Sequence, residues 1–204
     1  NPMGSWHKGE EIAAAMDKLP SRTLLVLDEA YVDTAPQGTA LPLAWGDPRV
    51  IRMRTFSKAY GMAGARVGYA IAAPELITAF HKVRNHFGMN RAAQAGALAA
   101  LEDQAWLCLV QERIAGAREQ IAQIARANDL VPLPSAANFV TLDCGRDGEF
   151  AKAILDALVA RGIFVRMPFV APQNRCIRIS CGTSEDLTAF AAALPDAIAV
   201  AKNG

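Results

Sequence analysis

A short apolar run that ends in acidic residues constrains the fold of this chain more than any other feature. Thr23 to Leu27 read TLLVL, and Asp28 to Tyr31 follow directly as DEAY. An apolar run of this length is typical of a buried strand in a parallel sheet. Because ligands bind at the carboxyl ends of strands in such sheets, Asp28 is well placed for chemistry. A cap or turn residue is the alternative interpretation of Asp28.

Helix-like and strand-like segments alternate around that run. Proline and glycine mark a loop over 34–48 and a linker over 131–134, after which a second α/β unit follows. The periodicity predicts helices over 9–19, from 74 onward, over 91–102, 106–128 and 148–161, and from 185 onward, with further strands over 50–55, 67–72, 138–142, 163–167 and 176–180. This alternation predicts an α/β protein.

The composition excludes several classes of function. The 204 residues carry 21 basic and 20 acidic side chains, so a net charge of +1 provides no general attraction to nucleic acid or anionic membrane. No apolar stretch reaches the ~18 residues of a membrane span, and no basic-then-apolar leader opens the chain. Cys108, Cys144, Cys176 and Cys181 lack CxxC spacing and clustered histidines, which argues against a zinc site or a disulfide framework. We expect a reducing, cytoplasmic setting and no metal.

Lys58 lies in an unusual sequence environment for a lysine, the segment TFSKAYGMAGARVGYAIA of residues 55–72. A lysine that is merely solvated usually has polar neighbours, whereas Lys58 lies among Gly, Ala, Val and Met and precedes a second cation, Arg66. This setting indicates a functional lysine. The short start of the chain, NPMGSW, is typical of a turn between elements, which predicts that an N-terminal portion of the protein precedes it.

Five motifs in a fixed order carry a family resemblance: NP-x-G at the start, DEAY, TFSK, GARVGY and RISCGT. Their letters and spacing resemble the fold type I pyridoxal-phosphate aminotransferases of class I/II, specifically the histidinol-phosphate aminotransferase-like branch. The resemblance implies that 1–105 are the remainder of the large, mostly parallel-sheet cofactor-binding domain. It implies that 106–204 are a long connecting helix and a small C-terminal α/β domain.

The resemblance also implies a role for each matched residue around pyridoxal 5'-phosphate. Lys58 would form the Schiff base with the cofactor aldehyde and, once freed, would move a proton at the reacting carbon. Asp28 would keep the pyridine nitrogen protonated, and Tyr31 would donate to the phenolic oxygen. The remaining expected cofactor ligands are Asn1 at the phenolic oxygen and Thr55, Ser57 and Arg66 at the phosphate. From the residues alone, Tyr31 and Ser57 are also consistent with packing or turn residues.

Three residues near the C-terminus match substrate positions of the family. Arg178 would bind the substrate α-carboxylate, Arg166 the distal phosphate, and Asn138 would lie near the substrate. From the residues alone, Arg166 is equally a surface residue or the partner of a helix carboxylate, and Asn138 a turn residue. The implied activity is transfer of an amino group between L-histidinol phosphate and 2-oxoglutarate by a homodimer. The alternatives are another amino-acid aminotransferase, an O-phosphothreonine decarboxylase-like enzyme, or a non-catalytic relative.

Overall fold

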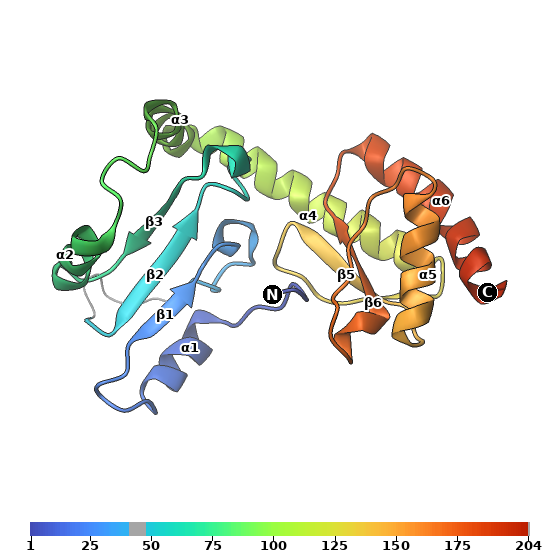
Figure 1. The fold of residues 1–204 in the computed structure, drawn as a ribbon, viewed down its shortest axis with the longest axis horizontal. Coiled ribbons are helices and arrows are strands. Elements are labelled where there is room, and N and C mark those ends of the chain that lie inside the picture. The colour runs from blue at the N-terminus through green and yellow to red at the C-terminus, as the bar shows by residue number, and fades with distance from the viewer. Residues whose placement is uncertain (41–47, 204) are drawn as a thin grey trace. The chain divides into compact units, whose positions relative to one another are not determined.

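The computed structural model describes residues 1–40 and 48–203, and these form two compact units. The N-terminal unit is Trp6–Gln111. The C-terminal unit is Asn1–Ser5 together with Glu112–Gly204. Each unit has its own three-stranded sheet (Figure 1), which agrees with the α/β class expected from the sequence. No helix in the described part of the chain is long and apolar enough to cross a membrane.

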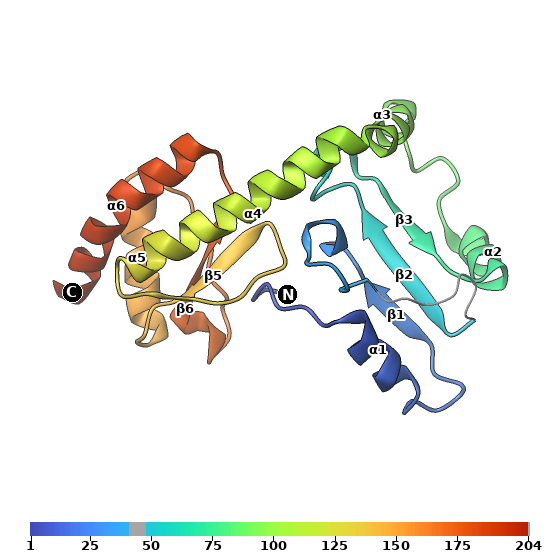
Figure 2. The ribbon, with the colours of Figure 1, turned by 180° about the vertical axis from the view of Figure 1, so that it is seen from behind.

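The sheet of the N-terminal unit consists of β1 (Leu25–Asp28), β2 (Val50–Thr55) and β3 (Gly68–Ile71). The central strand β2 runs parallel to β1 and antiparallel to β3 (Figures 1 and 2). The register places Asp28 opposite Met53 and Thr55 opposite Gly68. A Cβ at Gly68 would lie 2.8 Å from the carbonyl oxygen of Arg54, so glycine permits this close approach of the two strands. The ends of β1 and β2 therefore lie at one edge of the sheet.

One prediction about β1 is wrong. The strand begins at Leu25 and includes Asp28, and it is not buried on both faces, because the side chain of Val26 is 59% exposed. The physical reason is that only one face of the strand is covered. Leu25 and Leu27 are partly buried on one face, whereas Val26 and Asp28 are exposed on the other.

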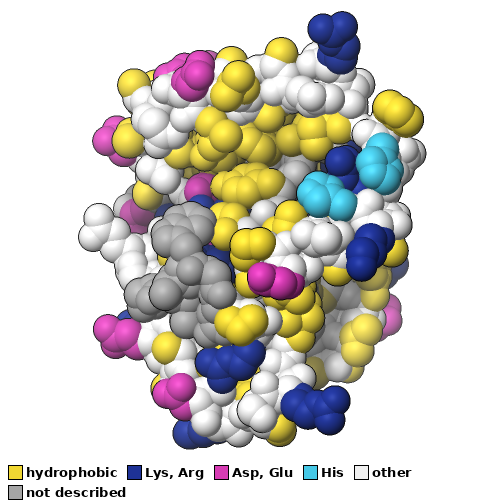
Figure 3. Space-filling model, turned by 90° about the vertical axis from the view of Figure 1, so that its left-hand side faces the viewer, with side chains coloured by type: hydrophobic (Ala, Val, Ile, Leu, Met, Phe, Trp, Pro, Cys, Tyr) yellow, Lys and Arg dark blue, Asp and Glu magenta, His cyan; other side chains and the backbone are white. Residues whose placement is uncertain are grey.

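Helices cover parts of the N-terminal unit close to the predicted positions. They are α1 (Gly9–Met16), α2 (Pro74–Val83), α3 (Arg91–Glu102) and the first part of α4 (Gln104–Arg126), with short 3-10 turns η1 (Val32–Thr34) and η2 (Ala63–Ala65). Alanines 93 and 97 of α3 pack with Phe56 and Val67 in a small core. Hydrophobic side chains also gather on the surface of this unit (Figure 3). Of the large hydrophobic residues of the unit, Phe87 is 95% exposed. The loop predicted over 34–48 lies partly outside the described residues.

The C-terminal unit has a fully antiparallel sheet of β4 (Val131–Pro132), β5 (Phe139–Asp143) and β6 (Cys176–Ser180). The second part of α4, α5 (Gly148–Val159) and α6 (Ser184–Asn203) complete it, with a 3-10 turn η3 (Gln173–Arg175). One face of the sheet supplies Leu142 and Ile177 to a core that the three helices share. Since side chains alternate along a strand, the other face carries Thr141 and, directly opposite it, Arg178.

Two predicted segments of this unit differ from the structure. The strand predicted over 163–167 is wrong, because only Arg166 pairs, as an isolated antiparallel bridge to Arg178. Pro168 follows almost at once and has no N–H with which to extend the pairing. The linker predicted over 131–134 contains the short strand β4, which pairs with the end of β5.

Candidate active site

Asp28 and Tyr31 lie where β1 ends. The Asp28 side chain is exposed, and its Oδ1 accepts a hydrogen bond of 2.9 Å from the N–H of Ala30, which confirms the turn interpretation of this residue. Tyr31 immediately precedes η1, and its carbonyl oxygen accepts a hydrogen bond from the hydroxyl of Thr34. Gln111 of α4 supports the same turn by donating to the Asp33 carbonyl oxygen at 2.7 Å. The turn is therefore held by both local and distant contacts.

Lys58 lies next to Tyr31. Its Nζ is 5.1 Å from the centroid of the Tyr31 ring, within the range of a cation–π contact. The residues between the end of β2 and Lys58 form a tight turn, in which the N–H of Ser57 donates to the Thr55 hydroxyl at 3.1 Å. The three side chains of Thr55, Ser57 and Lys58 are each partly exposed. The hydroxyls of Thr55 and Ser57 and the amine of Lys58 thus lie at or just after the end of β2. The neighbouring strand β1 ends at Asp28.

Arg66 has an unusual backbone conformation. Its φ of 56° and ψ of 47° lie in the left-handed region, which costs a non-glycine residue roughly 1 kcal/mol or more. Its guanidinium donates to the Ala63 carbonyl oxygen at 2.9 Å, and the side chain is exposed. This strain is consistent with a functional arginine, because such conformations cluster at ligand sites.

A buried ion cluster lies under the same strand ends, and the sequence reasoning missed it. Glu29 accepts hydrogen bonds from Arg52 at Oε1, with distances of 3.0 Å to Nε and 2.8 Å to Nη2, and from Arg54 Nε at Oε2, at 2.8 Å. The Glu29 side chain is 5% exposed. A signal for this cluster was present in the sequence. Arg52 and Arg54 alternate along a strand, so their two positive charges lie on one face, where a nearby carboxylate would compensate them.

Asp33 adds a second carboxylate near this cluster. Burial raises the pKa of the Asp33 carboxyl, the charge of Arg54 opposes that rise, and the charge of Glu29 adds to it. Two acids and two arginines therefore lie close together beneath the residues expected to hold the cofactor.

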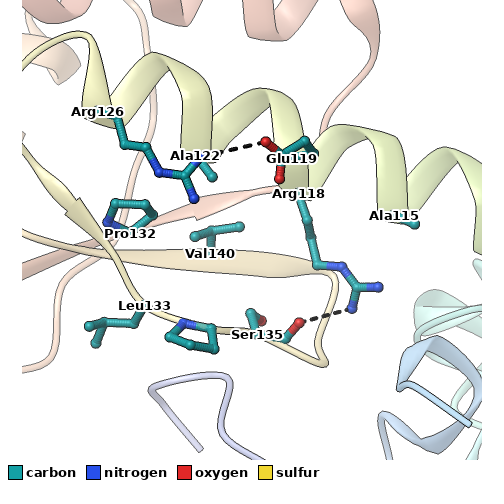
Figure 4. A pocket seen from close by; sticks show the side chains of 10 residues that line it. Ala115, Arg118, Glu119, Ala122, Arg126, Pro132, Leu133, Ser135 and Val140 are labelled. Atoms are coloured by element: carbon teal, nitrogen blue, oxygen red, sulfur yellow. Dashed lines mark hydrogen bonds and ion pairs between the residues drawn. The ribbon is translucent and has the colours of Figure 1, made fainter.

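The first residues of the chain form a turn anchored on the C-terminal unit. The Asn1 Oδ1 accepts a hydrogen bond of 2.7 Å from the Gly4 N–H, and the Gly4 carbonyl oxygen accepts one of 2.9 Å from Ala136. Arg118 of α4 supports the loop that contains Ala136 by donating to the Ser135 carbonyl oxygen at 3.1 Å (Figure 4). Gly4 has a φ of 87°, and a Cβ there would lie 2.5 Å from the Ser135 hydroxyl oxygen. Among residues 1–40 and 48–203, these contacts leave the Asn1 amide nitrogen available as a donor.

Arg166 and Arg178 lie side by side in the C-terminal unit. Each donates its backbone N–H to the carbonyl oxygen of the other, at 3.2 and 2.6 Å, so both side chains project from one face. Neither guanidinium forms an ion pair with a described residue. Arg178 lies 4.5 Å from the centroid of the Phe139 ring and Arg166 lies 5.9 Å from that of Phe164. The pair contributes to a cavity of about 760 Å³ with Pro2, Lys152, Leu155, Asp156, Phe164, Val165, Met167, Pro168, Phe169, Val170 and Gln173.

The expected site residues thus fall into two groups. Asp28, Tyr31, Thr55, Ser57, Lys58 and Arg66 belong to the N-terminal unit, and Asn1, Asn138, Arg166 and Arg178 to the C-terminal unit. Asn138 precedes β5 and is partly exposed, and its carbonyl oxygen accepts a hydrogen bond of 2.9 Å from Cys181.

Cysteines and metal ligands add no further site in the described residues. All four cysteines are free, and no group of three or more His, Cys, Asp or Glu side chains in the described ranges could hold a metal ion. Burial raises the pKa of the Cys144 thiol to about 12 and that of the Cys181 thiol to about 11.

Comparison with known proteins accounts for this arrangement. Residues 1–194 match the family model described as aminotransferase class I and II. The chain is 37% identical over 205 residues to histidinol-phosphate aminotransferase 2 of Ralstonia nicotianae, covering 99% of this chain and 55% of the relative. It is 40% identical over 200 residues to histidinol-phosphate aminotransferase 2 of Legionella pneumophila strain Lens, covering 95% and 53%.

A solved structure gives the same result for the fold. The crystal structure of histidinol-phosphate aminotransferase from Sinorhizobium meliloti, in complex with pyridoxal-5'-phosphate, is 53% identical and superposes with a TM-score of 0.94. The match covers 98% of this chain and 55% of that one. The chain therefore spans about half the length of the relatives it matches, with the fold type I architecture that the resemblance implied. The chain belongs to the class I and II aminotransferase family.

Proposed function

We propose that this chain is part of a pyridoxal-phosphate-dependent aminotransferase that moves an amino group between L-histidinol phosphate and 2-oxoglutarate. The observation that carries the proposal is the placement of Lys58 beside Tyr31, in the unit that also holds Asp28 at a strand end. The matched relatives are named histidinol-phosphate aminotransferases, which supports the substrate.

The residues of the N-terminal unit fit the cofactor chemically. Asp28 is exposed, and the hydrogen bond from Ala30 occupies only its Oδ1, so the carboxylate retains acceptor capacity for a protonated ring nitrogen. The hydroxyls of Thr55 and Ser57 and the guanidinium of Arg66 are the donors that a phosphate group requires. Lys58 supplies the primary amine that bonds to an aldehyde.

Pyridoxal phosphate, when bound, supplies an electron sink for the pair left at the substrate Cα after that carbon loses its proton. The chain supplies the groups that control this proton. With the cofactor bound, the Lys58 amine would take the proton from Cα as a general base and would give it back as a general acid. The Asp28 carboxylate would hold a proton on the ring nitrogen, and the Tyr31 hydroxyl and the Asn1 amide would donate to the phenolic oxygen. Loss of Asp28 therefore weakens the electron sink itself.

The C-terminal unit provides for the anionic ends of the substrate. Two guanidiniums on one face, without carboxylate partners among the described residues, suit a carboxylate and a phosphate. We assign the α-carboxylate of 2-oxoglutarate to Arg178, which is partly buried over Phe139, and the phosphate of L-histidinol phosphate to the more exposed Arg166. Asn138 is assigned to the substrate end of the site.

We also propose that the complete protein works as a homodimer in the cytoplasm, by analogy with the enzymes it resembles. Light scattering on the purified full-length protein gives its mass in solution. A monomer with full activity would contradict this part of the proposal.

The cofactor is tested by absorption spectroscopy on the full-length protein. Pyridoxal phosphate should give a visible band that borohydride removes, with the label mapped by mass spectrometry to Lys58 and absent from Lys58→Ala. The unreduced protein, loaded with pyridoxal phosphate, should then consume more than one equivalent of L-histidinol phosphate only with a 2-oxo acid present. Release of carbon dioxide from O-phosphothreonine, with no amino transfer from L-histidinol phosphate, would favour a decarboxylase, and a folded protein without the band would refute the proposal.

A further inference from the structure

Glu29 is a buried charge that the proposed chemistry does not use. Its carboxylate is 5% exposed and binds Arg52 and Arg54, whose side chains are 13% and 21% exposed. Three hydrogen bonds of 2.8 to 3.0 Å join the three side chains. Burying such a cluster costs desolvation energy that well-packed apolar residues of similar volume would avoid. Stability alone is therefore a weak reason for its presence.

The place of Glu29 in the chain connects it to the site. Glu29 lies between Asp28 and Tyr31, and its backbone N–H donates to the Met53 carbonyl oxygen at 2.9 Å, which continues the β1–β2 pairing past the end of β1. Its side chain then binds the two residues that flank Met53. Backbone and carboxylate together hold the turn after β1 against three successive residues of β2.

Through Arg54, the cluster is also connected along the chain to Lys58. Arg54 immediately precedes Thr55, the last residue of β2, and the turn held by the Thr55 hydroxyl leads on to Lys58. The Glu29 cluster is thus a buried side-chain connection between the segment that carries Asp28 and the segment that carries Lys58, in addition to the contact of Lys58 with the Tyr31 ring. An offset between these segments would move the acid relative to the amine.

We propose that Glu29 is a positioning residue: through Arg52 and Arg54 it fixes the Asp28–Tyr31 turn relative to the strand end that carries Lys58. This inference rests on the proposed cofactor chemistry and adds to it a residue outside the expected ligands. Its effect reaches the cofactor through Asp28 and Lys58, and the Glu29 side chain itself does not touch the cofactor.

The test compares Glu29→Gln and Glu29→Asp with a matched control in the full-length protein. The control is Asp143→Asn, which removes the 2.8 Å ion pair with Arg175 in the C-terminal unit, and neither of these residues is an expected cofactor ligand. Each variant is measured for its Kd for pyridoxal phosphate, for the position and pH titration of the visible band, and for Tm. The band and its titration report the surroundings of Lys58 and Asp28, which a purely structural role would leave unchanged.

We expect Glu29→Gln to raise the Kd for pyridoxal phosphate by about tenfold, the equivalent of one weakened charged hydrogen bond, and to shift the titration of the band. Glu29→Asp keeps the charge with a shorter reach and should lie between Glu29→Gln and wild type. The control should lower Tm without changing the band. A wild-type band and Kd in Glu29→Gln, with a lowered Tm, would overturn the inference.

Two further outcomes, a variant that does not fold and a wild-type protein that gives no band, can be told apart. Should Glu29→Gln not fold, Arg52→Lys keeps the charge but loses the two-point contact with Oε1, and the same spectral shift is expected of it. An unchanged band in Arg52→Lys would then overturn the inference. A folded wild-type protein that gives no band at all would overturn the proposed function and this inference with it.

Discussion

Arg166→Gln tests the assignment of the substrate phosphate. Arg166 is exposed, so its contact with a phosphate is partly screened by water. Hydrogen bonds to charged groups contribute about 1.5 to 3 kcal/mol, and the exposure of Arg166 places it at the low end. A loss of about 1.5 kcal/mol corresponds to about a tenfold decrease in kcat/KM. The matched substrate is L-histidinol, which lacks the phosphate and should show no decrease.

The assay is steady-state kinetics of the full-length protein with L-histidinol phosphate and L-histidinol at saturating 2-oxoglutarate. Arg146→Gln is the control, since Arg146 is also exposed and stacked on a phenylalanine, at 4.5 Å from the Phe150 ring centroid, but does not line the cavity. The preference for the phosphorylated substrate should fall about tenfold in Arg166→Gln alone. Equal losses with both substrates, or none with either, would refute the assignment.

Three further outcomes follow from the burial of particular side chains. Leu158→Ala, at a fully buried position, should cost about 2 to 5 kcal/mol in urea unfolding, whereas Val159→Ala, at a position 46% exposed, should cost less than about 1 kcal/mol; similar losses would contradict the packing described. Because burial raises the pKa of Asp33, its folded form binds a proton more tightly than its unfolded form, so its contribution to stability is present at low pH and is lost as the pH rises through the folded pKa. Asp33→Asn should therefore stabilise more at pH 7 than at pH 4, and an equal effect at both would show that the carboxyl is not perturbed. With a pKa of about 12, only about one Cys144 thiol in 10⁴ is ionised at pH 8, so iodoacetamide should label Cys144 in urea but not in the native protein; native labelling at the unfolded rate would contradict its burial.

Local signals in the sequence predicted much of the fold. The bounds of β2, α3 and β6 agree with the structure because turn residues and the switch of hydrophobic period mark them. The burial of β1 could not be predicted in this way, since an apolar run does not show which faces of a strand other elements cover. The failure at 163–167 has a similar cause, because pairing at Arg166 depends on Arg178, a distant residue.

In the site, too, residues within short motifs could be predicted from the sequence, whereas contacts between distant residues could not. The motifs placed Asp28 and Lys58, and the structure puts Tyr31 beside that lysine. Glu29 was read only as the neighbour of Asp28, because its partners lie 23 and 25 residues further along the chain. Contacts of that kind depend on the register of β1 and β2, which no short motif specifies.

Gly4 makes the beginning of this chain genetically vulnerable. Its left-handed backbone and the Ser135 hydroxyl beside it leave no space for any side chain, so every missense change at this codon adds atoms where Ser135 already stands. Such a change would detach Asn1 from its support without altering a single expected ligand. In a genome it would look like a harmless loop variant, although it would strain the turn on which Asn1 rests.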